Sequence, residues 1–240
     1  MCVIIYKPAG IEMPCEKDLK LCFETNRDGA GYMIPLNNKV IVRKGFMTFD
    51  DFKKDIRDFV KTNNIDPTNT PIVIHFRITT QGGVKQELCH PYPICDNYEQ
   101  MRALASECDL ALAHNGIISL CSEYSYGYTH HYDEKLKKYV ISTRPIPNYN
   151  DTMTFIKDYA SLIIDNDLYF ARKLNKVKLI EKLIGSSKLA IMNKKGFVKL
   201  IGKFEKRNDV YYSNLNAFNT HGFYTMQELL EMGALDDDYR

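Results

Sequence analysis

The sequence contains no tryptophan and no long apolar run, and its charges almost cancel. Its 32 Lys and Arg residues face 30 Asp and Glu residues, so the formal net charge is +2. Such a balance gives no electrostatic footprint for DNA, RNA or an anionic membrane. No apolar run approaches the ~20 residues of a membrane-spanning helix. The apolar stretch 2–6 is too short for a signal peptide and has no basic region before it. We therefore expect a cytoplasmic protein with neither a nucleic-acid nor a membrane partner.

The cysteines lack the spacings of disulfide frameworks and of zinc sites. There are seven, an odd number in a chain without an export signal, so we interpret them as reduced thiols. The nearest candidate for a metal site is Cys89-His90 with Cys95, followed much later by His130 and His131. No two of the cysteines are separated by only two residues, and no two histidines are four apart on a helical pattern. We expect no metal and no cofactor.

The patterns that are present predict one α+β domain over residues 1–240. Alternating or apolar runs typical of strands lie at 2–6, 29–34, 39–45, 71–78, 110–118, 188–192, 197–202 and 210–214. Amphipathic helices are predicted at 48–62, from Asp151 onward, at 168–184 and after a capping box that begins at Thr225. Most strand links are short enough for antiparallel pairing. Residues 119–150 have no clear periodicity, and we interpret them as a long loop or flap.

Cys2 is the first residue with possible chemistry. Removal of Met1 would leave a thiol and a free α-amino group on one residue at the start of a strand, which pairs a nucleophile with a base. The alternative is a small buried residue that opens an edge strand. A second stretch, 26–31 (NRDGAG), ends in two glycines around an alanine. These glycines would allow a close approach of two backbones or leave room for a ligand. The alternative is that the stretch is a plain turn before a strand.

Three further stretches end strands in polar groups. Arg77 leaves an apolar run, so it needs a protein carboxylate or a substrate carboxylate as partner. Asn115 and Gly116 offer an amide and a backbone N–H that can converge on one oxygen, as in an oxyanion hole, or they form an Asn-Gly turn. Asp151 is either a helix N-cap or a ligand.

Taken in order, these stretches resemble the class II glutamine amidotransferases, whose glutaminase domain is an N-terminal-nucleophile (Ntn) hydrolase. The matching stretches are Met1-Cys2 before an aliphatic strand, then RDGAG, HFRITTQGG, HPYPI, HNGII and NDT. The similarity runs from residue 2 to about 152 and resumes more loosely at 187–202 and 208–214. The resemblance implies a four-layer αββα sandwich of two antiparallel sheets.

The resemblance also implies a role for each matching residue. Cys2 would be the nucleophile, exposed by removal of Met1, and Asn115 with Gly116 would form the oxyanion hole. Arg77, with Thr80 nearby, would hold the α-carboxylate of the substrate glutamine, and Asp151 its α-ammonium. Ammonia would be released through a Cys2 thioester without a metal.

Three positions depart from the family pattern, and the acceptor of the nitrogen is not evident. Val3 replaces the usual glycine after the cysteine, Ile78 replaces a tryptophan, and Gln81 replaces a histidine. After residue 153 fewer than ninety residues remain, and the predicted helices and strands use them up. We therefore expect a partner to use the ammonia, such as a synthase or an ATP-dependent ligase.

Three other functions are compatible with the sequence. The protein could be an Ntn-type hydrolase of another small amide, or a catalytically inactive binding module of the same fold. Nucleic-acid binding would rest on the scattered Lys and Arg residues of 171–182, which a solvated helix face explains better.

Overall fold

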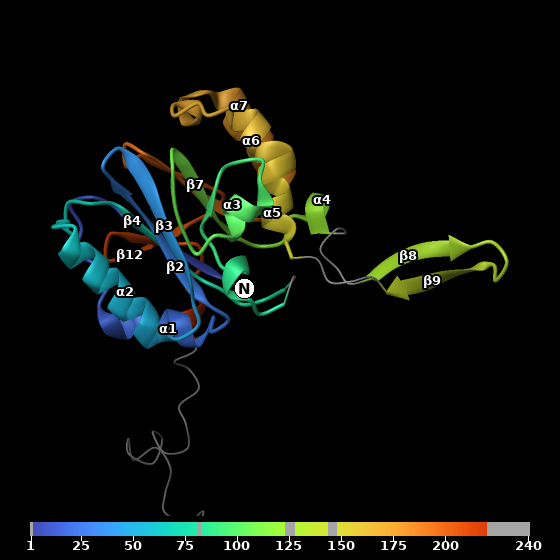
Figure 1. The fold of residues 1–240 in the computed structure, drawn as a ribbon, viewed down its shortest axis with the longest axis horizontal. Helices are drawn as coiled ribbons and strands as arrows, with labels where there is room; N and C mark the ends of the chain where they lie inside the picture. The colour runs from blue at the N-terminus through green and yellow to red at the C-terminus, as the bar shows by residue number, and fades with distance from the viewer. Residues whose placement is uncertain (1, 81–82, 123–127, 144–147, 220–240) are drawn as a thin grey trace, which may run out of the picture.

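A computed structural model describes residues 2–80, 83–122, 128–143 and 148–219, and it shows a mixed α+β architecture with a large antiparallel sheet. The large sheet has seven strands in the order β12-β13-β1-β4-β2-β3-β6 (Figure 1). Its strands are β1 (Val3–Lys7), β2 (Ala30–Leu36), β3 (Lys39–Phe46), β4 (Ile72–Phe76), β6 (Ala105–Cys108), β12 (Glu205–Arg207) and β13 (Val210–Tyr212). β1 therefore lies inside the sheet, between β4 and β13, so the alternative of an edge strand is wrong.

A second antiparallel sheet has four strands in the order β11-β10-β7-β5. These strands are β5 (Tyr92–Pro93), β7 (Leu110–Asn115), β10 (Lys188–Asn193) and β11 (Val198–Ile201). β7 pairs with β10 on one side and β5 on the other, and no hairpin follows its Asn115-Gly116 end. The simple hairpin turn considered for these two residues is therefore wrong.

The hairpin between β2 and β3 follows directly from two asparagines. Asn37 and Asn38 have φ angles of 49° and 59°. Two residues with positive φ form the type I′ turn whose twist suits a two-residue hairpin, and asparagine tolerates that conformation better than most residues. The sequence-based prediction of this turn is confirmed.

The helices pack outside the sheets. They are α1 (Glu16–Glu24), α2 (Phe49–Thr62), α3 (Tyr98–Arg102), α4 (Ser119–Ser122), α5 (Asp151–Phe155), α6 (Ser161–Ile164), α7 (Leu174–Ile184) and α8 (Asn216–Asn219). α2 begins as predicted, because the Thr48 hydroxyl accepts the Asp51 N–H at 3.1 Å. The predicted helix 168–184 is instead divided into a 3₁₀ turn, Phe170–Arg172, and α7. The capping box at Thr225 lies outside the described residues.

Where the sequence suggested a long loop or flap at 119–150, the described residues of this range form regular elements. They contain α4 and an antiparallel hairpin of β8 (Tyr128–Asp133) and β9 (Lys138–Thr143). Figure 1 shows this hairpin extending from the side of the molecule. Tyrosines and β-branched residues in both strands suit such a ribbon.

Three apolar clusters follow one another through the molecule. One joins the large sheet to α1 and α2 and includes Phe52 and Phe76. The next combines residues of both sheets, such as Ile4 and Ala113. The last joins the smaller sheet to the helices of 151–184 (Figure 1). The middle cluster therefore lies between the two sheets. The candidate site lies where β1 begins and where β4 and β7 end, because Cys2 directly precedes β1, Arg77 directly follows β4 and Gly116 directly follows β7.

Within the described residues, no helix combines the length and apolarity that crossing a membrane requires. All seven cysteines lie in the described part and are free thiols, as expected.

In the stretch 26–31, Gly31 is required by a close approach of two backbones, so the plain-turn alternative does not hold for it. A Cβ on Gly31 would lie 2.2 Å from the carbonyl oxygen of His90 and 2.9 Å from that of Arg43. Both contacts are with backbone atoms, which cannot move aside without displacing a strand or the His90 segment. Gly31 thus allows the His90 segment to pack against the large sheet.

We predict that Gly31→Ala lowers the free energy of unfolding by about 3 kcal/mol, because the new methyl group overlaps backbone atoms. Gly10→Ala is the matched control: Gly10 has a φ of 80° and nothing within 4 Å of an added Cβ. Its cost is therefore backbone strain alone, about 1–2 kcal/mol. Urea denaturation of both variants measures the difference, and an equal loss in the two would contradict the steric explanation.

Candidate active site

One small cavity brings together residues that are far apart in the sequence. Cys2, Arg77, Thr80, Gly116 and Asp151 all line it. The other lining residues are Ile78, His90, His114, Asn150 and Thr152. The volume is about 20 Å³, which has room for roughly one water molecule. Five of the six residues that the sequence singled out therefore share one cavity, and Asn115 precedes the lining residue Gly116.

Cys2 is held at the start of β1 by the backbone on either side. Its Sγ donates to the carbonyl oxygen of Ile78 at 3.3 Å and lies 3.4 Å from the Ile78 nitrogen. The Asn214 side chain donates to the Cys2 carbonyl oxygen at 2.8 Å. Burial raises the pKa of the Cys2 thiol, and the positive charge of Arg77 partly offsets the rise. The resting sulfur is consequently a thiol that needs a base to become a nucleophile.

Arg77 follows β4 and is fixed by the glycine-rich stretch. The Arg77 N–H donates to the Gly29 carbonyl at 2.8 Å, and the Asp28 N–H donates back to the Arg77 carbonyl at 2.9 Å. The side chain is buried, and its Nη1 donates to the Gly83 carbonyl at 3.0 Å. The Asp28 carboxylate accepts the Thr79 N–H at 2.7 Å. The 26–31 stretch thus sets the course of the chain that carries Arg77 and Thr80.

Asn115 and Gly116 end β7 at the opposite side of the junction. Gly116 has a φ of 141°, and a Cβ there would lie 2.3 Å from Oγ of Ser187, so glycine is required. Asn115 is buried, and its Nδ2 lies 2.7 Å from Oγ of Ser213. Its Oδ1 is buried without a hydrogen-bond partner among the described residues. Such an orphaned buried amide atom is uncommon in folded proteins.

Asp151 is not the N-cap of α5; its neighbour Asn150 is. The Asn150 side chain accepts the Met153 N–H at 2.9 Å. The buried Asp151 carboxylate accepts the N–H groups of Ile118 and Thr152, each at 2.8 Å. Within the described residues, no Lys or Arg forms an ion pair with it. A buried carboxylate without a cation favours a ligand that brings a positive charge.

Three buried histidines lie behind the cavity. His75 Nε2 is 2.9 Å from the His114 carbonyl oxygen and 2.9 Å from His90 Nδ1, and His114 Nδ1 is 2.7 Å from the Thr152 hydroxyl. Burial lowers the pKa of all three imidazoles, that of His75 to about 3. They are therefore neutral at physiological pH and leave Arg77 and Asp151 as the charged groups that line the cavity.

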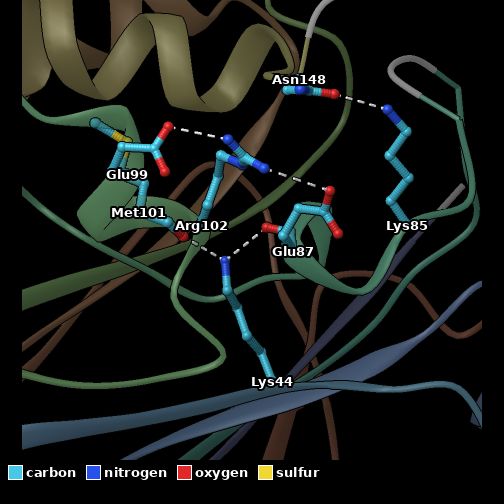
Figure 2. A network of polar contacts seen from close by, with 7 residues as sticks. All are labelled: Lys44, Lys85, Glu87, Glu99, Met101, Arg102 and Asn148. Atoms are coloured by element: carbon cyan, nitrogen blue, oxygen red, sulfur yellow. Dashed lines mark hydrogen bonds and ion pairs between the residues drawn. The ribbon is translucent and has the colours of Figure 1, made fainter.

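A polar network joins β3, the segment 85–88, α3 and the segment before α5 (Figure 2). The Lys44 ammonium, on β3, donates to the carbonyls of Glu87 and Met101, and burial lowers its pKa well below the usual value. Arg102 forms ion pairs with the carboxylates of Glu87 and Glu99. Lys85 donates to the Asn148 side chain at 2.9 Å, as Figure 2 shows. This contact joins the segment after Thr80 to the segment that leads into α5.

Sequence reasoning missed several residues of the site. His90 and His114 lie in the quoted HPYPI and HNGII stretches, and Ser213 and Asn214 end the stretch 208–214, but none of them was given a role. Their contacts join segments up to 212 residues apart. The sequence signal available for these residues was a polar side chain at the end of an apolar strand. That signal does not show which distant residue the side chain contacts.

Other parts of the molecule offer no stronger candidate. Among the described residues, four cavities are larger, at about 170, 210, 380 and 400 Å³, and none of the predicted site residues lines them. The two largest of these four lie beside α2 and beside the 10–15 segment. In the searched part of the chain, no group of three or more His, Cys, Asp or Glu side chains is arranged to hold a metal ion. No family model matches this chain, and the search for curated relatives found none at the required significance.

We predict that Arg77→Met shifts alkylation of Cys2 by iodoacetamide to higher pH. The thiolate is the reacting form, and loss of the nearby positive charge raises the thiol pKa further. The rate of Cys2 modification between pH 7 and 10.5, followed by peptide mass spectrometry, reports this shift. Exposed Cys15 serves as the internal reference for the reagent, and buried Cys22 reports unfolding. An unchanged profile would show that the guanidinium does not act on the sulfur.

Proposed function

We propose that this protein is a class II glutamine amidotransferase-type glutaminase that releases ammonia from the glutamine side chain through a Cys2 thioester. The observation that carries the proposal is the gathering of a thiol, a guanidinium and an unpaired carboxylate around one cavity, next to Asn115-Gly116. A free α-amino acid has a carboxylate and an ammonium of matching opposite charges. Arg77 would bind the α-carboxylate with Thr80 beside it, and Asp151 would bind the α-ammonium.

The layering of the fold supports the same proposal. The three apolar clusters separate helices, the large sheet, the smaller sheet and helices again. We propose that this order is the four-layer αββα sandwich of the Ntn hydrolases. In such an arrangement the nucleophile lies at one end of a central strand. Cys2 has a corresponding position, because it directly precedes β1, which is paired on both sides. The free thiols and the absence of a spanning helix from the described residues support a cytoplasmic location.

The chemistry would use the groups of Cys2 itself. With Met1 removed, the α-amino group takes the thiol proton, directly or through a water, and the sulfur bonds to the side-chain amide carbon of glutamine. A terminal amine with a pKa of about 7.7–8.0 suits a base that must later act as an acid. The oxyanion would be bound by Asn115 and Gly116. The carbon–nitrogen bond then breaks, the amine returns its proton to the leaving ammonia, and water hydrolyses the thioester to glutamate and free thiol.

The departures from the family pattern fall on residues with different roles. Val3 is buried and pairs with Phe76 of β4, so a branched residue is accommodated beside the nucleophile. Ile78 contacts Cys2 through its backbone, which does not depend on the side chain. Gln81 lies outside the described residues. The volume of about 20 Å³ is too small for glutamine, so binding requires the lining groups to move apart.

Two alternatives share the same site. An Ntn-type hydrolase of another small amide would keep Cys2 and the oxyanion hole without needing both charged groups. An inactive binding module is favoured by the small cavity and the raised thiol pKa. The ammonia released by an active enzyme would pass to an acceptor handled by a partner synthase or ligase, which forms part of our proposal.

We predict that the purified protein lacks Met1 and hydrolyses glutamine to glutamate and ammonia. Cys2→Ala abolishes turnover because it removes the nucleophile, and Asn115→Ala lowers kcat about 10²–10³-fold because it removes one oxyanion donor. Intact-mass spectrometry and a coupled glutamate assay measure both. A glutamine-analogue electrophile that fails to modify Cys2 would favour the inactive module, and an unaltered rate in Asn115→Ala would refute the oxyanion assignment.

We further predict that Asp151→Asn raises KM for glutamine about 10–100-fold, because it replaces a charge-assisted hydrogen bond to the α-ammonium. The matched control is a substrate without that ammonium, 4-carbamoylbutyrate. Hydrolysis of 4-carbamoylbutyrate should be weaker than that of glutamine, and Asp151→Asn should change its KM little. This substrate has no positive charge for Asp151 to bind. Equal losses with the two substrates would indicate that Asp151 acts on the structure of the site and not on the ammonium.

A further inference from the structure

The contact between Asn115 and Ser213 joins the candidate oxyanion hole to the strand of the nucleophile. Ser213 follows β13 and is fully buried. Its Oγ lies 2.7 Å from Asn115 Nδ2 and accepts the Ile4 N–H at 2.9 Å. Ile4 belongs to β1, two residues after Cys2. A single hydroxyl thus bridges the strand that begins beside the thiol and the residue that ends β7.

Counting hydrogens shows which way the Asn115 amide should face. A serine hydroxyl has one hydrogen to donate and two lone pairs. With Nδ2 toward Ser213, the hydroxyl accepts from both Ile4 and Asn115, and its own hydrogen has no acceptor among the described residues. Asn115 Oδ1 is left without a partner as well. Among the described residues, this orientation leaves three buried polar functions unsatisfied: Oδ1, the serine hydrogen and the second hydrogen of Nδ2. Each is costly inside a protein.

Rotation of the amide by 180° exchanges two nearly identical atoms. Oδ1 then accepts the Ser213 hydrogen, and the hydroxyl has both a donor and an acceptor role satisfied. The flip therefore satisfies the carbonyl oxygen and leaves only the two hydrogens of the Asn115 NH₂, which now occupies the position of the former Oδ1. This group can donate but cannot accept, so its missing partner must be an acceptor such as a carbonyl oxygen or an oxyanion.

The backbone of Ser213 is held on both its N–H and its carbonyl. The Ser213 N–H donates to the Ile4 carbonyl at 2.9 Å, and the Ser213 carbonyl accepts from the Lys188 ammonium. Lys188 is the residue of β10 that pairs with Asn115 in the smaller sheet. A backbone group of the large sheet and a side chain of the smaller sheet therefore fix the backbone from which the Ser213 hydroxyl contacts Asn115.

We propose that Ser213 is a positioning residue that sets the Asn115 amide with Oδ1 on the serine hydroxyl and Nδ2 free for the oxyanion. The proposal rests on the proposed function for its effect on rate, but the orientation of the amide stands by itself. Without the hydroxyl hydrogen, nothing among the described residues distinguishes the two orientations, and the carbonyl end of the amide would repel the developing oxyanion.

The kinetic test is Ser213→Ala alone and combined with Asn115→Ala. We expect Ser213→Ala to lower kcat for glutamine about tenfold or more, with KM changed less than about threefold, because the ground-state contacts of the substrate remain. In the Asn115→Ala background the same substitution should change kcat less than about twofold. Multiplicative losses in the double variant would overturn the proposal, since a merely structural defect acts in either background.

A control variant and a diffraction measurement distinguish a specific effect on the Asn115 amide from a general structural defect and from a failure of the proposed function. Ser161→Ala removes a partly buried hydroxyl that donates to the Lys157 carbonyl, and it should leave kcat unchanged at temperatures below the unfolding midpoints of all variants. Neutron diffraction from deuterated wild-type crystals locates the amide deuterons of Asn115 directly. Deuterons on the side away from Ser213 support the proposal, and deuterons facing Ser213 overturn it. A wild type without glutaminase activity would refute the proposed function, whereas the neutron map would still decide the orientation.

Discussion

The candidate site depends on the backbone pairing of β1 with both of its neighbours in the large sheet. On one side, β4 carries the chain to Ile78, whose backbone groups contact Cys2 Sγ. On the other side, β13 leads to Ser213 and Asn214, which bind the backbone of Ile4 and Cys2. A strand paired on one side only would leave the thiol free to move relative to β7. Because two neighbours fix β1, the thiol has a defined position in a small cavity that groups from five separate parts of the chain line.

The electrostatics of the cavity follow from burial as much as from charge. Desolvation keeps the three histidines neutral and the thiol protonated. The guanidinium of Arg77 and the carboxylate of Asp151 both line the cavity, and backbone hydrogen bonds support the carboxylate. Two opposite charges in a site with little water complement a zwitterion better than a singly charged molecule. This is the physical reason for preferring an amino-acid amide to other amides as the substrate.

Local signals sufficed for much of the fold. The Asn37-Asn38 turn, the Thr48 cap and the apolar strands were predictable because each depends on residues close together in the sequence. The position of β1 inside the sheet and the hairpin of 128–143 were not, because strand partners are set by distant residues and the second hairpin lacks a strong turn signal. In the site, Cys2 was singled out because it follows Met1 and opens an apolar run, and Arg77 and Gly116 because they end apolar runs. Ser213 was missed because its importance is a matter of hydrogen-bond geometry across nearly the whole chain.

Because Cys2 directly precedes an interior strand, the terminus that carries a purification tag matters. β1 pairs with β4 and with β13, and Cys2 directly precedes β1 and lines the cavity. A purification tag fused ahead of Cys2, or the short remnant left after its cleavage, would move the chain's amino group away from the Cys2 sulfur. The proposed mechanism would then lose its base. Affinity handles therefore belong at the other terminus.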